Sequence, residues 1–390
     1  MDRELFRKRD ESSISLSWNQ IPGELLARQP RRQIMKTQHC LSAVVTACLV
    51  LGGIAACGGG NDSSAGNGGP KNVRMTWFGV TNWHYQIGDL GILLDGAVGY
   101  PARDPNPAMV TRVHDALKLK GDVDVVLLGH LHGDHSVDTP EWAKQTGAQY
   151  YGSKAACAEA VTYGISGDKC TSLYGGEKVQ LNEHVAMRVV RWVHSIGCGL
   201  LQNGGGIETF GYLFTVKTPD KTLTWYVTDS GAGGRDLTTD QIDTDGVNRG
   251  APLTNLAKAV RDANIDGFEV WQGGPESRVV NQARTVIPAF GVKTFMPHHY
   301  GARGGFNITQ GLHYPYSEDE MPELKKFLAS NNVPQLYSTN YFDAYVYDST
   351  GIRADGNAEV KAAMGLPANG IGPGPQGTNP RAGDMECPGD

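Results

Sequence analysis

The segment 129–135, which reads Gly-His-Leu-His-Gly-Asp-His, constrains this chain more than any other feature. It places three histidines and a carboxylate within six residues, although the whole chain of 390 residues contains only 11 histidines. It directly follows the apolar run Val123–Leu128, which is typical of a strand buried on both faces in a layered α/β fold. Imidazole and carboxylate are ligands of divalent transition metals, and functional groups gather at strand ends in such folds. The segment therefore predicts half of a two-metal hydrolytic site.

The spacing inside this segment predicts how its side chains divide between two ions. His130 and His132 are two residues apart, so in extended chain they share one face and can hold one ion. Gly133 permits a tight turn, after which Asp134 and His135 are expected to point toward a second ion. The remaining ligands must come from later strand ends. The candidates there are His194 after MRVVRWV, Asp229 at the end of TLTWYVTD, and His298 and His299 after KTFMP.

The order of apolar patterns predicts the fold class. Strands come first, then strand–helix alternation, then strands and strand–helix alternation again. Predicted strands include Val73–Phe78, Gly91–Asp95, Met187–His194 and the hairpin of Phe210–Val216 with Thr222–Asp229. With 40% hydrophobic and 19% charged residues, the chain can bury a sizeable core. We expect an α/β protein built as a four-layer αββα sandwich, with two mixed β-sheets packed face to face and flanked by helices.

The ordered series His130-x-His132-x-Asp134-His135, His194, Asp229 and His299 resembles the metallo-β-lactamase superfamily, over roughly residues 73–305. The resemblance is to its hydrolase branch with a bridging aspartate, and the upstream ending Leu93–Gly96 is similar as well. It implies the αββα fold and two divalent metal ions, zinc in the first place, with Mn²⁺ or Fe²⁺ as alternatives. By this likeness His130, His132 and His194 hold one ion, Asp134, His135 and His299 hold the other, and Asp229 bridges them. The superfamily's Pro-x-His-Tyr form favours His299 over His298.

The same resemblance implies a hydrolase in which Asp134 or Asp229 moves a proton beside the activated water. It is nearest to the lactonase and phospholipase-D-like group, so we expect an ester, lactone or phosphodiester bond in a small-molecule or lipid-like substrate. Candidate substrate contacts are His84, His298 and Arg303; the alternatives are an exposed loop histidine for His84 and a surface arginine for Arg303. A net charge of −6 argues against general nucleic-acid binding. A non-catalytic binding module and an iron-based redox protein are the alternatives from other classes.

The N-terminal region is predicted to be a targeting segment. The apolar run 41–56 ends in Ile-Ala-Ala before Cys57, which resembles a bacterial lipoprotein processing box with Cys57 as the lipidated residue. The expected organisation is therefore an extension over 1–34, a signal peptide over 35–57 and a Gly/Ser-rich tether over 58–72. A hydrolase domain follows over 73–350, and a helix with a Gly/Pro-rich tail over 351–390. We expect a protein of the bacterial cell envelope, lipid-anchored in the outer membrane and facing the periplasm.

Export affects the interpretation of the remaining cysteines. Cys157, Cys170, Cys198 and Cys387 remain after processing, and four cysteines in an oxidising compartment allow three pairings. Joining Cys157 to Cys170 closes a short loop and leaves Cys198 for Cys387. This pairing is predicted, with free buried thiols as the alternative.

Overall fold

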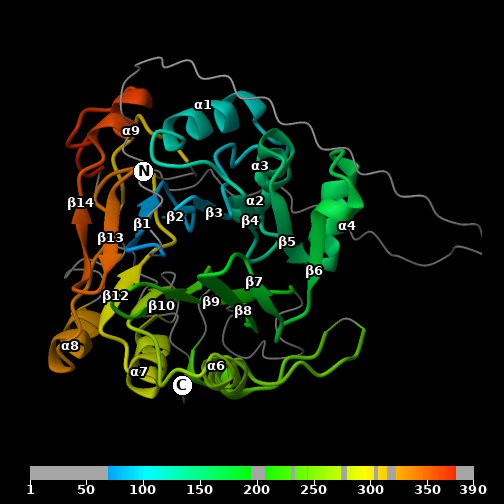
Figure 1. Cartoon of the computed structure of the whole chain (residues 1–390), viewed down its shortest axis with the longest axis vertical. Coiled ribbons are helices and arrows are strands. Elements are labelled where there is room, and N and C mark those ends of the chain that lie inside the picture. Colours follow the sequence, from blue (N-terminus) through cyan, green and yellow to red (C-terminus); the bar gives the residue numbers. More distant parts are fainter. Residues whose placement is uncertain are drawn as a thin grey trace, which may run out of the picture. The chain divides into compact units, whose positions relative to one another are not determined.

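The structure is a computed structural model that describes residues 69–194, 207–229, 233–243, 245–273, 279–302, 306–313 and 322–374. Within these residues two mixed β-sheets lie face to face, and helices cover the outer face of each (Figure 1). The predicted α/β class and the four-layer arrangement are confirmed.

The first sheet has eight strands in the order β14-β13-β1-β2-β3-β4-β5-β6. The pairs from β3 to β6 are parallel and the others are antiparallel, so the sheet is mixed. Its strands are β1 (Asn72–Trp77), β2 (Trp83–Ile87), β3 (Leu90–Leu94), β4 (Val125–Leu127), β5 (Gln149–Ser153), β6 (Cys170–Leu173), β13 (Ala344–Asp348) and β14 (Gly351–Asp355).

The second sheet has six strands in the order β12-β11-β10-β9-β8-β7. The pairs β10–β11 and β11–β12 are parallel, and the others are antiparallel. Its strands are β7 (Lys178–Gln180), β8 (Val185–Arg191), β9 (Phe210–Lys217), β10 (Thr222–Thr228), β11 (Val270–Gly273) and β12 (Thr294–Pro297). Strands β8, β10, β11 and β12 therefore point in one direction, and their carboxyl ends lie at one end of the sheet.

The helices complete the outer layers. Above the first sheet lie α1 (Pro107–Leu117), α3 (Thr139–Thr146) and α9 (Ala358–Ala363), with α4 (Lys154–Thr162) beside β6 (Figure 1). The second sheet is covered by α6 (Pro252–Asp262) and α7 (Val279–Phe290). The remaining helical elements are α2 (Gly133–Ser136), the 3₁₀ turn Gly167–Lys169, α5 (Gly234–Thr238) and α8 (Pro322–Ser330).

Aromatic side chains fill the space between the two sheets. Tyr85 of β2 lies 5.6 Å from Trp225 of β10, and Phe214 of β9 stacks on Trp225 with ring centroids 4.5 Å apart. All three side chains are buried, so each removes a large apolar area from water. The Tyr212 hydroxyl donates to the carbonyl of Leu128 at 2.6 Å, which ties the second sheet to the chain just before the histidine-rich segment.

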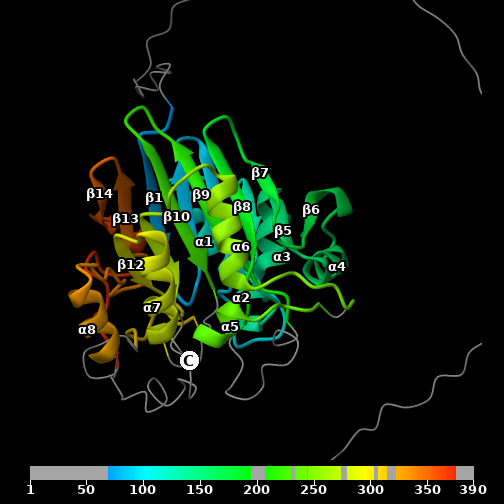
Figure 2. The same ribbon diagram turned by 90° about the horizontal axis from the view of Figure 1, so that it is seen from below.

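The described chain begins at one end of the strands, and the short helices α2 and α5 lie at the other end (Figure 2). Helices α2 and α5 lie at one extremity, whereas β1 begins at the other (Figure 2). At that second extremity Gly69 lies against the ring of His184, just before β8, and Pro70 lies beside the Gly88 turn. The described chain thus begins opposite the carboxyl ends of β8 and β10.

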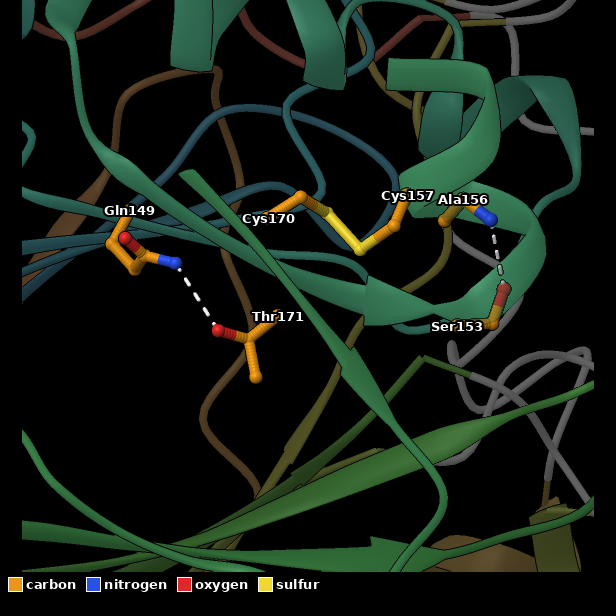
Figure 3. Close-up of a disulfide and its surroundings, with 6 residues drawn as sticks. All are labelled: Gln149, Ser153, Ala156, Cys157, Cys170 and Thr171. Carbon is orange, nitrogen blue, oxygen red and sulfur yellow. Dashed lines mark hydrogen bonds between the residues drawn. A yellow bond between two sulfur atoms is a disulfide. The ribbon is translucent and has the colours of Figure 1, made fainter. Parts of the chain in front are cut away.

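Several boundaries differ from the sequence prediction. Strand β8 ends at Arg191, three residues before His194. Strand β14 pairs with β13 in the first sheet, so the boundary expected at residue 350 falls inside a β-hairpin. Cys157 and Cys170 form the predicted disulfide, with their Cα atoms 5.6 Å apart (Figure 3). Cys198, Cys387 and the segment 1–68, including Cys57, lie outside the described residues. None of the described helices is long and apolar enough to cross a bilayer.

Candidate metal centre

The histidine-rich segment leaves β4 and turns at once into a one-turn helix. His132 is the N-terminal cap of α2, and the helix begins at Gly133, where the sequence predicted only a tight turn. His130 is buried and His132 is exposed, whereas Asp134 is half-buried and His135 is fully buried. The helical turn is what places Asp134 and His135 on the site side of the chain.

Side chains from both sheets converge here. The side chains form three groups, and inside each group the candidate ligand atoms lie within 4.8 Å of one another. The groups are His130 with His132 and His194, Asp134 with His135 and His299, and Asp229 with His130 and His135. Asp229 is therefore grouped with one histidine from each of the two other sets. All seven predicted ligands come together, in the two sets that the sequence resemblance implies.

The imidazoles approach one another by their nitrogen atoms. His130 Nε2 lies 3.0 Å from His132 Nδ1, and His135 Nε2 lies 3.2 Å from His299 Nε2. His194 lies with its ring 4.5 Å from that of His132 and 4.8 Å from that of His130. At this range one neutral imidazole can donate its N–H to the next, or both nitrogens can turn their lone pairs to a shared cation.

Asp229 lies at the middle of the cluster. Its side chain is fully buried, with Oδ2 2.5 Å from His130 Nδ1 and 3.6 Å from His135 Nδ1. The other oxygen, Oδ1, is buried without a hydrogen-bond partner, which is costly for a carboxylate that no cation compensates. A Cβ at Gly129 would lie 1.9 Å from Asp229 Oδ2, so only glycine allows this approach.

Asp95 is a functional residue that the sequence reasoning missed. His135 Nδ1 donates to Asp95 Oδ2 at 2.9 Å, which leaves Nε2 free to act as a ligand. The Gly129 amide donates to Asp95 Oδ1 at 3.0 Å, and the Thr81 hydroxyl donates to Oδ2. Asp95 thus orients two parts of the histidine segment at once. Its place at the carboxyl end of β3, next to β4, was the signal available in the sequence.

The protonation states of His130 and His132 suit metal ligation, whereas His135 has to lose a proton to bind a metal ion. Burial lowers the pKa of His130 well below its usual value and also lowers that of His132. Burial raises the pKa of Asp229. Burial alone would lower the pKa of His135, but the carboxylates of Asp95 and Asp229 outweigh it and raise the pKa to about 9. Burial opposes ionisation of Asp134, yet its hydrogen bond with His299 and the charge of His135 lower its pKa. His130 and His132 are therefore neutral at pH 7.

The donor set fits two divalent transition-metal ions. It combines five imidazoles with two carboxylates and contains no thiolate. The unpartnered Asp229 oxygen and the facing imidazole nitrogens are the observations that carry this fit. The same nitrogen and oxygen ligands suit zinc, manganese and iron.

The two adjacent histidines after β12 have different surroundings. His299 Nε2 lies 3.5 Å from Asp134 Oδ2, and its backbone is left-handed, with φ of 72°. This strained conformation is held by a hydrogen bond from the His299 amide to the Val80 carbonyl at 2.9 Å. His298 is fully buried and points elsewhere: Trp83 Nε1 donates to its Nδ1 at 3.0 Å, and its Nε2 donates to the Thr228 carbonyl.

These contacts correct two predicted substrate contacts. Both nitrogens of His298 are engaged by the protein, so this residue is closed to a substrate. His84 lies in β2, is only 1% exposed and contacts the carbonyl of Asp122, which precedes the amino end of β4. The exposed-loop alternative for His84 is therefore wrong as well, because side chains alternate along β2: Trp83 contacts His298, whereas His84 is buried on the other face of the sheet. Arg303 lies outside the described residues.

Comparisons with known proteins place the chain near metal-dependent hydrolases. No family model matches it. It is 28% identical over 95 residues to a UPF0173 metal-dependent hydrolase of Ignicoccus hospitalis, which is 24% of this chain and 38% of that protein. It is 32% identical over 129 residues to a UPF0173 metal-dependent hydrolase of Thermodesulfovibrio yellowstonii, which is 32% of this chain and 46% of that protein. The chain thus matches less than half the length of these curated relatives.

A solved structure is similar over a longer stretch. The metallo-β-lactamase fold protein YhfI from Bacillus subtilis is 14% identical, with 71% of this chain and 99% of that chain covered, at a TM-score of 0.41. The names of the two curated relatives agree with the predicted hydrolase at this coarse level. The lactonase and phospholipase-D-like branch stays a prediction.

Proposed function

We propose that this protein is a metal-dependent hydrolase with a dinuclear, zinc-type centre that cleaves an ester, lactone or phosphodiester bond. The observation that carries the proposal is the convergence of seven ligands from both sheets in two sets joined by Asp229. The similarity to proteins named metal-dependent hydrolases supports the same reaction class. A pair of divalent ions, when bound, supplies activation of water and stabilisation of negative charge on the substrate.

The residues of the chain provide the proton transfer. Asp134 is the better proton acceptor of the two carboxylates, because its side chain is 26% exposed whereas that of Asp229 is 0% exposed. The lowered pKa keeps Asp134 ionised at neutral pH but makes it a weaker base, so its role as proton acceptor rests on its partly exposed position beside His299 and not on its basicity. Asp229 is closed to solvent and serves to hold His130 and His135 in place.

The cellular setting belongs to the same proposal. The apolar run 41–56 before Cys57 supports export as a lipoprotein, anchored at the outer membrane and facing the periplasm. A small-molecule or lipid-like substrate suits that setting, and a net charge of −6 does not favour nucleic acid.

Metal analysis combined with a substrate panel tests the function. Purified protein is expected to contain close to two metal ions per chain and to hydrolyse at least one generic phosphodiester, lactone or thioester. The Asp134→Asn variant should lower kcat by about 10²–10⁴-fold, the usual effect of losing a general base. An unchanged kcat in this variant would contradict the role of Asp134. Bound metal without turnover on the whole panel would favour the binding module instead.

A further inference from the structure

A cavity lies beside β8 of the second sheet, and none of its lining residues is one of the seven candidate metal ligands. It has a volume of about 170 Å³ and is lined by β8, the chain before α6, and α6 itself. Four of its lining side chains are basic: Arg188 and Arg191 from β8, Arg249, and Lys258 from α6. Basic groups therefore face this cavity from three separate segments.

The arginines of β8 carry donors that the protein leaves unused. Arg191 is only 6% exposed, and its Nε and Nη1 atoms are buried without hydrogen-bond partners. The Nε and Nη1 atoms of Arg188 are also buried and without partners, while its Nη2 donates to the Asp262 carbonyl. A buried guanidinium with unsatisfied N–H groups is costly unless an acceptor fills the space beside it.

Four neighbouring carboxylates equal the four basic side chains in number but do not satisfy all of their donors. Asp243 accepts from Arg191 Nη2 and from Arg249 Nε, each at 2.5 Å. Asp262 pairs with Lys258, Asp245 lies 3.6 Å from Arg249, and Glu208 lies 4.0 Å from Arg191 Nη1. These carboxylates accept hydrogen bonds from Arg191 Nη2 and Arg249 Nε, whereas Glu208 is too far from Arg191 Nη1 for a hydrogen bond, and Arg191 Nε and both unpartnered donors of Arg188 have no acceptor in the described part of the chain. Within the described residues, Arg188 has no carboxylate partner of its own.

The turn at Tyr174 and Gly175 packs closely against the arginines of the cavity. The ring of Tyr174 lies 5.1 Å from the Arg249 guanidinium, and Gly175 is left-handed, with φ of 98°. A Cβ at Gly175 would lie 2.6 Å from Arg191 Cβ, so glycine lets this turn close over Arg191. Asn255 Nδ2 donates to the carbonyls of Arg191 and Arg249, which fixes the two arginines relative to α6.

We propose that this cavity binds a tetrahedral oxyanion, such as the sulfate ion or the phosphate group of a small metabolite. Guanidinium N–H groups match the oxygens of such an ion and bind it by charge-assisted hydrogen bonds. The volume admits a single group of this size rather than an extended ligand. The site is independent of the proposed hydrolase activity, because it shares none of the seven metal ligands.

Inorganic sulfate at constant ionic strength is a direct probe, with sodium chloride as the reference salt. We expect sulfate at about ten times its Kd to raise the Tm of the zinc-loaded protein by about 2–4 °C. Arg188→Gln should lose most of that rise, because it removes the unpaired donors and leaves the metal ligands in place. Arg284→Gln, at an exposed position on α7, is the matched control and should keep the full rise.

Comparing the sulfate-induced rise in Tm between the wild-type protein and the variants distinguishes binding at this cavity from other effects of sulfate. General salting-out and sulfate at the metal ions would raise the Tm of the wild-type protein and of Arg188→Gln equally, and that result would overturn the proposal. If Arg188→Gln does not fold, Lys258→Gln at an exposed position on α6 takes its place and should weaken sulfate binding severalfold by calorimetry. An unchanged Kd in that variant would likewise overturn the proposal.

Discussion

Gly129 allows the buried carboxylate of Asp229, at the centre of the site, to pack directly against the backbone. Substitution by alanine would place a Cβ 1.9 Å from Asp229 Oδ2, and neither the buried carboxylate nor the backbone beside it has room to move. We expect Gly129→Ala to destabilise the protein by about 1–3 kcal/mol, the usual cost of overpacking, and to lower its metal content. Gly167→Ala is the control, because nothing lies within 4 Å of a Cβ there. Urea unfolding and metal analysis measure the two effects; equal metal content in both variants would contradict the packing argument.

His298 is expected to act on the centre by positioning Asp229. It joins Trp83 to the carbonyl of Thr228, the residue before Asp229. His298→Gln should weaken metal binding by about 10–100-fold, as loss of a supporting contact commonly does. A chelator competition measures that affinity.

His84→Gln provides the matched comparison for His298. His84 is also a fully buried histidine bonded to a backbone carbonyl, but its side chain lies on the other face of the first sheet from that of Trp83, which bonds His298. Its substitution should lower stability and leave metal affinity unchanged. Equal losses of affinity in the two variants would show that His298 has only a structural role.

At the scale of single residues, the sequence predicted the candidate metal ligands better than the residues that position them. The seven ligands could be placed because four lie in one short segment and the others follow apolar strands in order. Asp95 was missed because its contact with His135 depends on the neighbouring positions of β3 and β4. His84 was misjudged because its burial depends on the chain around Asp122, 38 residues later, which leaves no pattern in the local sequence.

At the scale of elements, Glu269 joins four segments of the fold beside β11. Lys221 and Lys293 form ion pairs with its two oxygens at 2.8 and 2.6 Å, and the Tyr347 hydroxyl of β13 donates to it at 2.8 Å. Burial opposes its ionisation, but these partners lower its pKa from 4.5 to about 2. The unfolded chain therefore binds more protons than the folded one between these values, and stability falls as pH decreases through this range.

Glu269→Gln tests this linkage. The carboxylate side chain is 23% exposed, so we expect the variant to lose about 1–2 kcal/mol at pH 7, less than the full pKa difference implies. The difference from wild type should shrink between pH 4.5 and 2, as the wild-type carboxyl becomes protonated. Denaturant unfolding of the metal-free protein at several pH values measures it; a difference that stays constant to pH 2 would refute the linkage.

The elements themselves were predictable where a pattern is long and local. The hairpin of β9 and β10 agrees with the strands expected over Phe210–Val216 and Thr222–Asp229 to within one residue. Strands β6 and β7 were missed, because they have four and three residues and little apolar pattern. The hairpin of β13 and β14 was missed for another reason: it completes a sheet begun by β1 more than 250 residues earlier, and such pairing leaves no local signal.

At the scale of the whole molecule, metal binding is expected to hold the two sheets together. His130, His132, Asp134 and His135 follow β4 of the first sheet, whereas His194, Asp229 and His299 follow strands of the second. Ions bound only by the folded state stabilise it, by about 4 kcal/mol when free metal is 1,000 times Kd. EDTA should therefore lower the Tm by several degrees. Zinc-saturated EDTA is the control, and an identical Tm with both reagents would contradict the coupling.

The position of Gly69 and Pro70 determines how the molecule would be presented on a support. Since these residues lie beside the turns at His184 and Gly88, a linker attached there leaves from the extremity opposite the histidine cluster. Protein immobilised through its amino-terminal side would expose the ligand-bearing loops to the solution, whatever the nature of the support. Attachment through the loops that follow β4 or β12 would instead cover the same cluster.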